Sequence, residues 1–123
     1  MPWNLDSDRP IFIQIIDRIQ MQILSGKYQP GDKLPSVRDL AMEAAVNPNT
    51  MQKALAELER SGLVYTQRTS GRFITEDQNM IDQLKKERAK ETIETFFLHM
   101  QSIGFSKEET MAMMSETMRG EKE

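Results

Sequence analysis

The 123-residue sequence contains no cysteine and a single histidine, His99. The absence of cysteine excludes disulfide bonds, zinc–thiolate clusters and thiol nucleophiles, and one histidine cannot form a multi-histidine metal site. No apolar run approaches the roughly 18 residues of a membrane-spanning helix. The first residues, MPWNLDSDRP, have neither the basic end nor the apolar stretch of a signal peptide. We therefore expect a cytoplasmic protein with no metal site and no membrane association.

The sequence also lacks a large excess of charge of either sign. It has 16 Lys and Arg and 19 Asp and Glu, which gives a net charge of −3. The two parts of the chain differ in this balance. Residues 1–75 carry nine basic and eight acidic side chains, and residues 76–123 carry seven and eleven. Binding to a polyanion would therefore depend on local placement of Arg and Lys in the first part. An ordinary solvated surface is the alternative interpretation of this composition.

Three helices are predicted in the first half of the chain. Apolar residues at helical spacing indicate one helix from about residue 9 to Gly26. The turn KYQPGDKLP leads to a short second helix, for which Ser36 is the predicted N-cap. The pair Asn47 and Pro48 is typical of a helix start and begins the third helix. Two short helices so close in sequence must cross steeply, so residues 36–62 are predicted to form a helix-turn-helix.

A β-hairpin is predicted over residues 63–75. The runs LVYTQR and RFIT have strand-like composition and flank a turn at Thr69, Ser70 and Gly71. A helix-turn-helix followed by a hairpin is a winged helix.

The remaining residues predict two further helices, one over Asn79–Ile103 and one after a capping box formed by Ser106 and Glu109. Such short helices bury little by themselves, so their apolar rows are predicted to join two copies of the chain. An adaptable pocket for apolar ligands is the alternative use of the methionines. The predicted dimerisation residues are Ile93, Phe96, Phe97, Met100, Ile103, Met111, Met114 and Met118.

The predicted fold class is therefore mainly α (α+β). A winged helix-turn-helix domain occupies residues 1–76, and a C-terminal helical hairpin used for dimerisation occupies residues 77–123.

The segment PGDKLPSVRDLA, together with NPNTMQKALAELERSGLV and RTSGRFI, resembles the GntR family of bacterial transcriptional regulators over about residues 9–75. The short tail is similar to that of the small YtrA-type branch, because it leaves no room for the large effector domains of other branches. The resemblance implies a homodimeric repressor that binds double-stranded DNA at an inverted-repeat operator. It also implies a link to transporter genes.

The resemblance further implies which residues contact DNA. Arg38 would reach phosphate or guanine, the start of the third helix would enter the major groove, and the wing would reach the minor groove. The sequence departs from the family pattern at the wing, which has one glycine instead of two, and at Pro48 and Gln52, where basic residues are common. The predicted DNA-binding residues are Ser36, Arg38, Asn47, Asn49, Thr50, Gln52, Lys53, Arg68, Ser70, Gly71 and Arg72.

Each assignment has a simpler alternative. Arg38 could instead pair with Asp39 or Glu43, Ser36 could act only as a cap, and the remaining polar residues could form a solvated face. For the whole protein, the alternative is a winged-helix adaptor that binds proteins without reading DNA. Catalysis is not predicted, because no nucleophile, base and oxyanion donor are suggested together, and no cofactor is implied.

A small apolar or amphiphilic effector is predicted to release the repressor from DNA. Its expected site lies near Phe96, Phe97 and Met100, between the winged domain and the tail helices.

Overall fold

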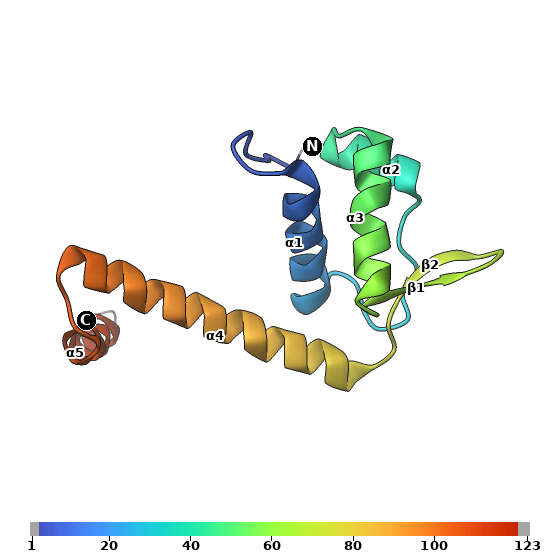
Figure 1. Cartoon of the computed structure of the whole chain (residues 1–123). Coiled ribbons are helices and arrows are strands. Elements are labelled where there is room, and N and C mark those ends of the chain that lie inside the picture. The colour runs from blue at the N-terminus through green and yellow to red at the C-terminus, as the bar shows by residue number, and fades with distance from the viewer. Residues whose placement is uncertain (1–2, 121–123) are drawn as a thin grey trace. The chain divides into compact units, whose positions relative to one another are not determined.

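The computed structural model describes residues 3–120 (Figure 1). It divides into two compact units, one up to Leu84 and one from Lys85, and each is described by itself. The elements are α1 (Ile11–Leu24), α2 (Val37–Ala44), α3 (Pro48–Arg60), β1 (Val64–Gln67), β2 (Gly71–Ile74), α4 (Gln78–Ile103) and α5 (Lys107–Gly120). Three helices followed by a two-stranded wing confirm the predicted winged helix.

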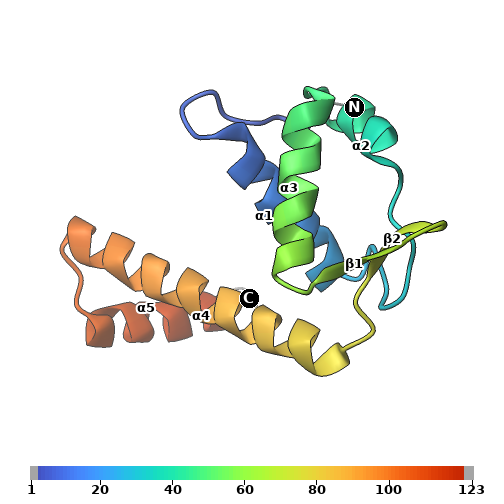
Figure 2. The ribbon, with the colours of Figure 1, turned by 45° about the vertical axis from the view of Figure 1, so that its right-hand side comes forward.

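The core of the first unit forms where α1 and α3 lie side by side, as both views show (Figures 1 and 2). Each helix has apolar residues at intervals of three and four, so each buries one face. The buried residues are Ile15, Ile19 and Ile23 on α1, Leu40, Ala41 and Ala44 on α2, and Met51, Ala54, Leu55 and Leu58 on α3. Each fully buried Ile, Leu or Met contributes about 1.5–3 kcal/mol of transfer free energy.

Short-range hydrogen bonds set the ends of α2 and α3. The Ser36 hydroxyl accepts from the Asp39 amide at 3.1 Å, which confirms the predicted cap. The Asn47 side chain accepts from the Asn49 amide at 2.7 Å. Between these helices Ala45 takes a left-handed conformation with φ of 60°, which ends α2 and turns the chain into α3.

The wing has more backbone partners than the hairpin alone supplies. β1 and β2 pair antiparallel, with Val64 opposite Ile74. The Gly31 amide donates to the Ile74 carbonyl at 2.9 Å, and the Leu34 amide donates to the Arg72 carbonyl at 2.9 Å. The second half of KYQPGDKLP was predicted only as a turn. In the structure it runs beside β2 and forms backbone hydrogen bonds with that strand.

The first turns of α4 belong to the winged-helix unit. The Asp77 carboxylate accepts from the Met80 amide at 3.2 Å and caps the helix. Ile81 is buried, and Met80 and Leu84 pack on the same core. The wing thus ends near the predicted boundary at residue 76, whereas the compact unit continues to Leu84.

The second unit contains the rest of α4 and all of α5. The predicted capping box is confirmed, because the Ser106 amide donates to Glu109 at 2.9 Å and the Glu109 amide donates to the Ser106 hydroxyl at 3.1 Å. Within residues 85–120 only Thr110 is buried, so these helices leave most of their apolar side chains exposed. Across the described part of the chain, no helix has the length and apolar character needed to cross a membrane.

Glu59 on α3 holds both strands of the wing. Its carboxylate accepts from the Arg72 Nε at 3.2 Å. A hydrogen bond from the Thr66 hydroxyl, followed by that from Arg72, lowers the pKa of Glu59 despite the opposing effect of burial. The wing is therefore attached to α3 through β1 and β2 together.

This arrangement predicts a pH-dependent contribution of Glu59 to stability. The pKa of Glu59 in the folded protein lies below its ordinary value of 4.5. The charged carboxylate therefore stabilises the fold at pH values above 4.5, and this stabilisation is lost as the pH falls through the lowered pKa. At neutral pH, Glu59→Gln is expected to lower the free energy of unfolding by less than about 1 kcal/mol, because the group is partly exposed. Urea denaturation of both proteins across the acid range measures the difference. A difference that does not shrink in acid would contradict this role.

Candidate nucleic-acid interface

The start of α3 carries polar side chains outside its buried stripe. Asn49, Gln52 and Lys53 are exposed opposite that stripe, because the apolar face of α3 is covered by the core. Asn47, the exposed N-cap, and Thr50, which is half-buried, lie closer to the core. The amide, hydroxyl and ammonium groups of these predicted DNA-binding residues are suited to base edges and phosphates.

Lys53 has a defined position on this face. Its ammonium nitrogen lies 4.0 Å from the centroid of the Phe12 ring, a cation–π contact between α3 and α1. The contact leaves the outer side of the ammonium group available, since Lys53 is exposed.

Arg38 lies in the first turn of α2 and is exposed. Within residues 3–120 it has no ion-pair partner, so the alternative pairing with Asp39 or Glu43 is not formed. Glu43 instead accepts a hydrogen bond from the Trp3 indole at 3.0 Å. Burial, followed by the negative charge of Glu43, raises the pKa of the Tyr28 phenol. The guanidinium of Arg38 therefore remains available to a ligand.

A groove of about 770 Å³ lies between the start of α2 and the wing. Three basic side chains and the carboxylate of Asp39 line it. The structure thus brings together predicted residues from two distant segments of the chain. These residues are Ser36, Arg68, Ser70, Gly71 and Arg72, joined by Lys33.

Lys33 was not predicted from the sequence as a site residue. The pairing of its segment with β2 places it against the wing, where its Cε lies 3.2 Å from the position of a Cβ built on Gly71. Gly71 has a φ of 109°, so both backbone conformation and space favour glycine there. The available signal was the position of Lys33 inside PGDKLPSVRDLA, but its proximity to Gly71 depends on tertiary pairing.

The two arginines of the wing differ in their surroundings. Arg68 is exposed and, within the described residues, forms no ion pair. Arg72 binds Glu59, and its side chain is 20% exposed. Arg68 is therefore the more accessible arginine of the wing, while Arg72 holds the wing on α3.

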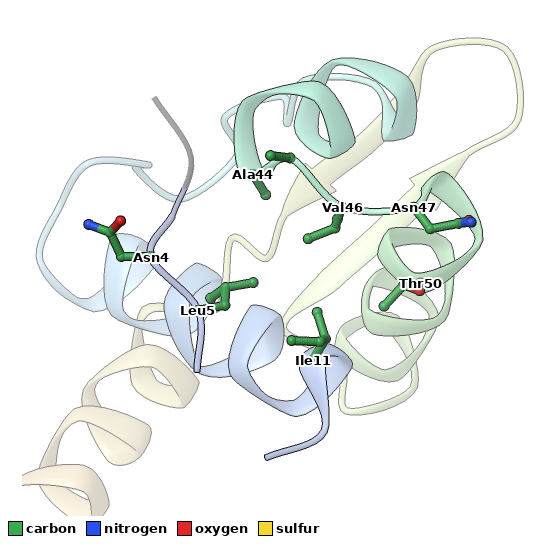
Figure 3. Close-up of a pocket in the computed structure, with 8 residues that line it drawn as sticks. Asn4, Leu5, Ile11, Ala44, Val46, Asn47 and Thr50 are labelled. Atoms are coloured by element: carbon green, nitrogen blue, oxygen red, sulfur yellow. The ribbon is translucent and has the colours of Figure 1, made fainter. Parts of the chain in front are cut away.

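A hollow of about 550 Å³ lies beside the start of α3. Leu5, Ile11 and Val46 face it from the N-terminal segment, from α1 and from the turn between α2 and α3 (Figure 3). Asn47 and Thr50 also line it. The N-terminal segment therefore lies beside Asn47 and Thr50, two of the predicted DNA-binding residues.

The predicted dimerisation residues lie on α4 and α5 in the second unit. Phe97 and Met100 are half-buried there. The others are exposed, namely Ile93, Phe96, Ile103, Met111, Met114 and Met118. Six of the eight predicted residues are therefore exposed within this unit.

Residues 3–120 contain no group of three or more His, Asp or Glu side chains arranged to hold a metal ion. His99 is exposed on α4.

Comparison with known protein sequences identifies the family. The profile described as "Bacterial regulatory proteins, gntR family" matches residues 13–74. The chain is 43% identical over 108 residues to the uncharacterized HTH-type transcriptional regulator YhcF of Bacillus subtilis, covering 88% of this chain and 89% of that protein. It is 49% identical over 71 residues to the HTH-type transcriptional repressor YtrA of Bacillus subtilis, covering 58% of this chain and 55% of that protein.

Solved structures agree with the sequence comparison. A GntR family transcriptional regulator from Listeria monocytogenes superposes with a TM-score of 0.84 at 42% identity, covering 91% of this chain and 98% of that one. The DNA-binding domain of AraR in complex with operator ORX1 superposes with a TM-score of 0.53 at 28% identity, covering 61% of this chain and 92% of that one.

The matched profile spans the helix-turn-helix and the wing, and the match to YhcF extends over most of both chains. The chain therefore belongs to the GntR family of bacterial regulatory proteins and is a transcriptional regulator with a winged-helix DNA-binding domain.

Proposed function

We propose that this protein is a homodimeric repressor that acts in the cytoplasm by occupying an inverted-repeat operator. The observation that carries the proposal is the set of exposed polar residues at the start of α3, together with an unpaired Arg38 on α2 and a groove lined by basic residues between α2 and the wing. The operator complex of AraR and the repressor name of YtrA support this use of the fold. Control of transporter genes remains a prediction.

The chemistry of the surface suggests a division of labour on DNA. The Asn49 and Gln52 amides are suited to adenine, and Arg38 is suited to guanine or phosphate. Arg68 at the wing tip has the charge and reach for the minor groove, and Lys33 in the groove is suited to a phosphate. Base contacts would supply specificity, and the phosphate contacts would supply salt-dependent affinity.

The apolar tail supports a dimer. Ile93 is 54% exposed and Ile103 is 59% exposed. Exposed apolar rows of this kind mark an interface, and a second copy of the chain would cover them by two-fold pairing. Two copies would then place one winged-helix domain on each half-site of an operator. A small-molecule effector near Phe97 and Met100 remains a prediction.

Arg38→Ala is expected to weaken binding to the preferred DNA sequence by about 5- to 100-fold, because a guanidinium contact to a base or phosphate is lost. The DNA is the duplex that the wild-type protein enriches from a random pool, hereafter the selected duplex. Titration against the selected and scrambled duplexes measures affinity and specificity. Arg60→Ala is the matched control, since Arg60 is an exposed arginine at the other end of α3. Absence of any enriched sequence would instead favour the protein-interaction adaptor.

Lys33→Ala is expected to weaken binding to the selected and scrambled duplexes about equally, because a phosphate contact carries no sequence information. The slope of log affinity against log salt should decrease in magnitude by about one. Titrations at several salt concentrations measure this slope. Lys27→Ala, which removes an exposed lysine outside the groove, should leave it unchanged. An unchanged slope for Lys33→Ala would remove Lys33 from the interface.

Ile93→Glu is expected to shift the protein from dimer to monomer, because the seam would have to bury an unpaired carboxylate. Light scattering after size-exclusion chromatography at micromolar concentration measures the mass. Leu98→Glu is the matched control, since Leu98 is 65% exposed on the same helix but lies outside the predicted seam. A wild-type monomer, or equal effects of both substitutions, would contradict the proposed interface.

A further inference from the structure

The N-terminal arm, residues 3–9, precedes the residues that the family profile matches, yet it is firmly attached to the winged helix. Trp3, the single tryptophan of the chain, is only 4% exposed. Ordering an irregular segment and its tryptophan costs conformational entropy, so the contacts of Trp3 must compensate for that loss.

Trp3 joins two helices through three contacts. Its indole nitrogen donates to the Glu43 carboxylate at 3.0 Å, at the end of α2. Its carbonyl accepts from the Arg18 guanidinium at 2.6 Å, on α1. The central carbon of the Arg18 guanidinium lies 5.5 Å from the centroid of the indole ring, a cation–π contact. Trp3, Arg18 and Glu43 together form what we call the arm clamp.

The rest of the arm is held by Gln14, a side chain that is 5% exposed on α1. The Gln14 amide nitrogen donates to the carbonyls of Asp6 and Arg9 at 2.8 and 3.1 Å, and its oxygen accepts from the Asp6 amide at 2.7 Å. Between these attachments Leu5 faces Val46 in the turn before α3 (Figure 3). The arm therefore lies along the helix-turn-helix from the end of α2 to the start of α3.

The charge of the arm argues against direct binding to DNA. Residues 3–9 contain Asp6, Asp8 and Arg9, and Arg9 lies 3.8 Å from the Asp6 carboxylate. A net negative segment with its arginine paired has little attraction for phosphates. We therefore expect the arm to affect DNA binding through the elements that it holds.

The element most dependent on such support is α2. It has eight residues and buries only Leu40, Ala41 and Ala44. A helix of two turns has little stability of its own, so tertiary contacts set its orientation. Arg38 lies on its first turn and Glu43 on its last, so fixing Glu43 also restrains the direction in which Arg38 extends.

We propose that Trp3 is a positioning residue for operator binding, which fixes α2 and its Arg38 by hydrogen bonding to Glu43. The proposal rests on the proposed function. It assigns the N-terminal arm a role in placing the side chains that are proposed to contact DNA.

The test is a double-mutant cycle between Trp3 and Arg38. Trp3→Phe keeps an aromatic ring but removes the indole donor, and affinity for the selected duplex is expected to fall about three- to tenfold, the equivalent of one hydrogen bond. In the Arg38→Ala background the same substitution is expected to change affinity less than twofold, because the group it positions is absent. A loss of global stability alone would weaken both backgrounds equally.

Glu43 supplies the matched controls. Glu43→Gln keeps an acceptor for the indole and should bind the selected duplex within about twofold of wild type. Glu43→Leu removes the acceptor and should weaken binding as Trp3→Phe does, with no further loss when the two are combined. Thermal unfolding of every variant verifies that binding is measured on folded protein.

Trp3 also reports its own position, since all tryptophan fluorescence comes from this residue. Acrylamide should quench the wild-type emission weakly and the Glu43→Leu emission more strongly. Quenching of the wild type as strong as in the urea-unfolded chain would show that the arm is not docked and would overturn the proposal.

The remaining outcomes separate this inference from the proposed function. Equal effects of Trp3→Phe with and without Arg38 would refute the positioning role while leaving DNA binding intact. The positioning role would also be refuted if Arg38→Ala weakened binding to the selected duplex as expected while Trp3→Phe bound it with wild-type affinity. Failure to bind any selected duplex would refute the proposed function, and the inference with it.

Discussion

The burial of one face of α3 is the constraint on which the rest of the structure depends. Met51, Ala54, Leu55 and Leu58 are within 1% of complete burial, so the rotation of this helix about its axis is fixed. With that rotation fixed, Asn49, Gln52 and Lys53 must lie on the open surface. The same packing that stabilises the domain therefore also determines which side chains of α3 are left on the surface.

Contacts to α3 and α2 then fix the surrounding parts. Glu59 holds the wing through Thr66 and Arg72, and the arm clamp holds the end of α2. Glu59 lies on α3 and Glu43 on α2, and each accepts hydrogen bonding from a segment outside the helix-turn-helix. Acidic residues thus assemble a surface whose outward groups are basic and polar, which accounts for DNA binding by a chain of net negative charge.

Local signals made much of this fold predictable from sequence. The caps at Ser36 and Asn47 and the capping box at Ser106 and Glu109 each depend on residues within three positions of one another. Lys33 beside Gly71, Lys53 over Phe12, and Trp3 bound to Glu43 were not predictable, because they join segments far apart in sequence. The pattern of apolar residues places side chains on a face, but only the packed fold selects their partners.

The exposed methionines of α5 have a chemical consequence. Met111 is 60% exposed, Met114 is 43% exposed and Met118 is 67% exposed, in a chain without cysteine. Oxidants will therefore act on this protein chiefly at thioethers, and methionine sulfoxide replaces an apolar group with a polar one. Ageing of the protein in air would erode the apolar character of the tail while leaving the buried Met51 protected.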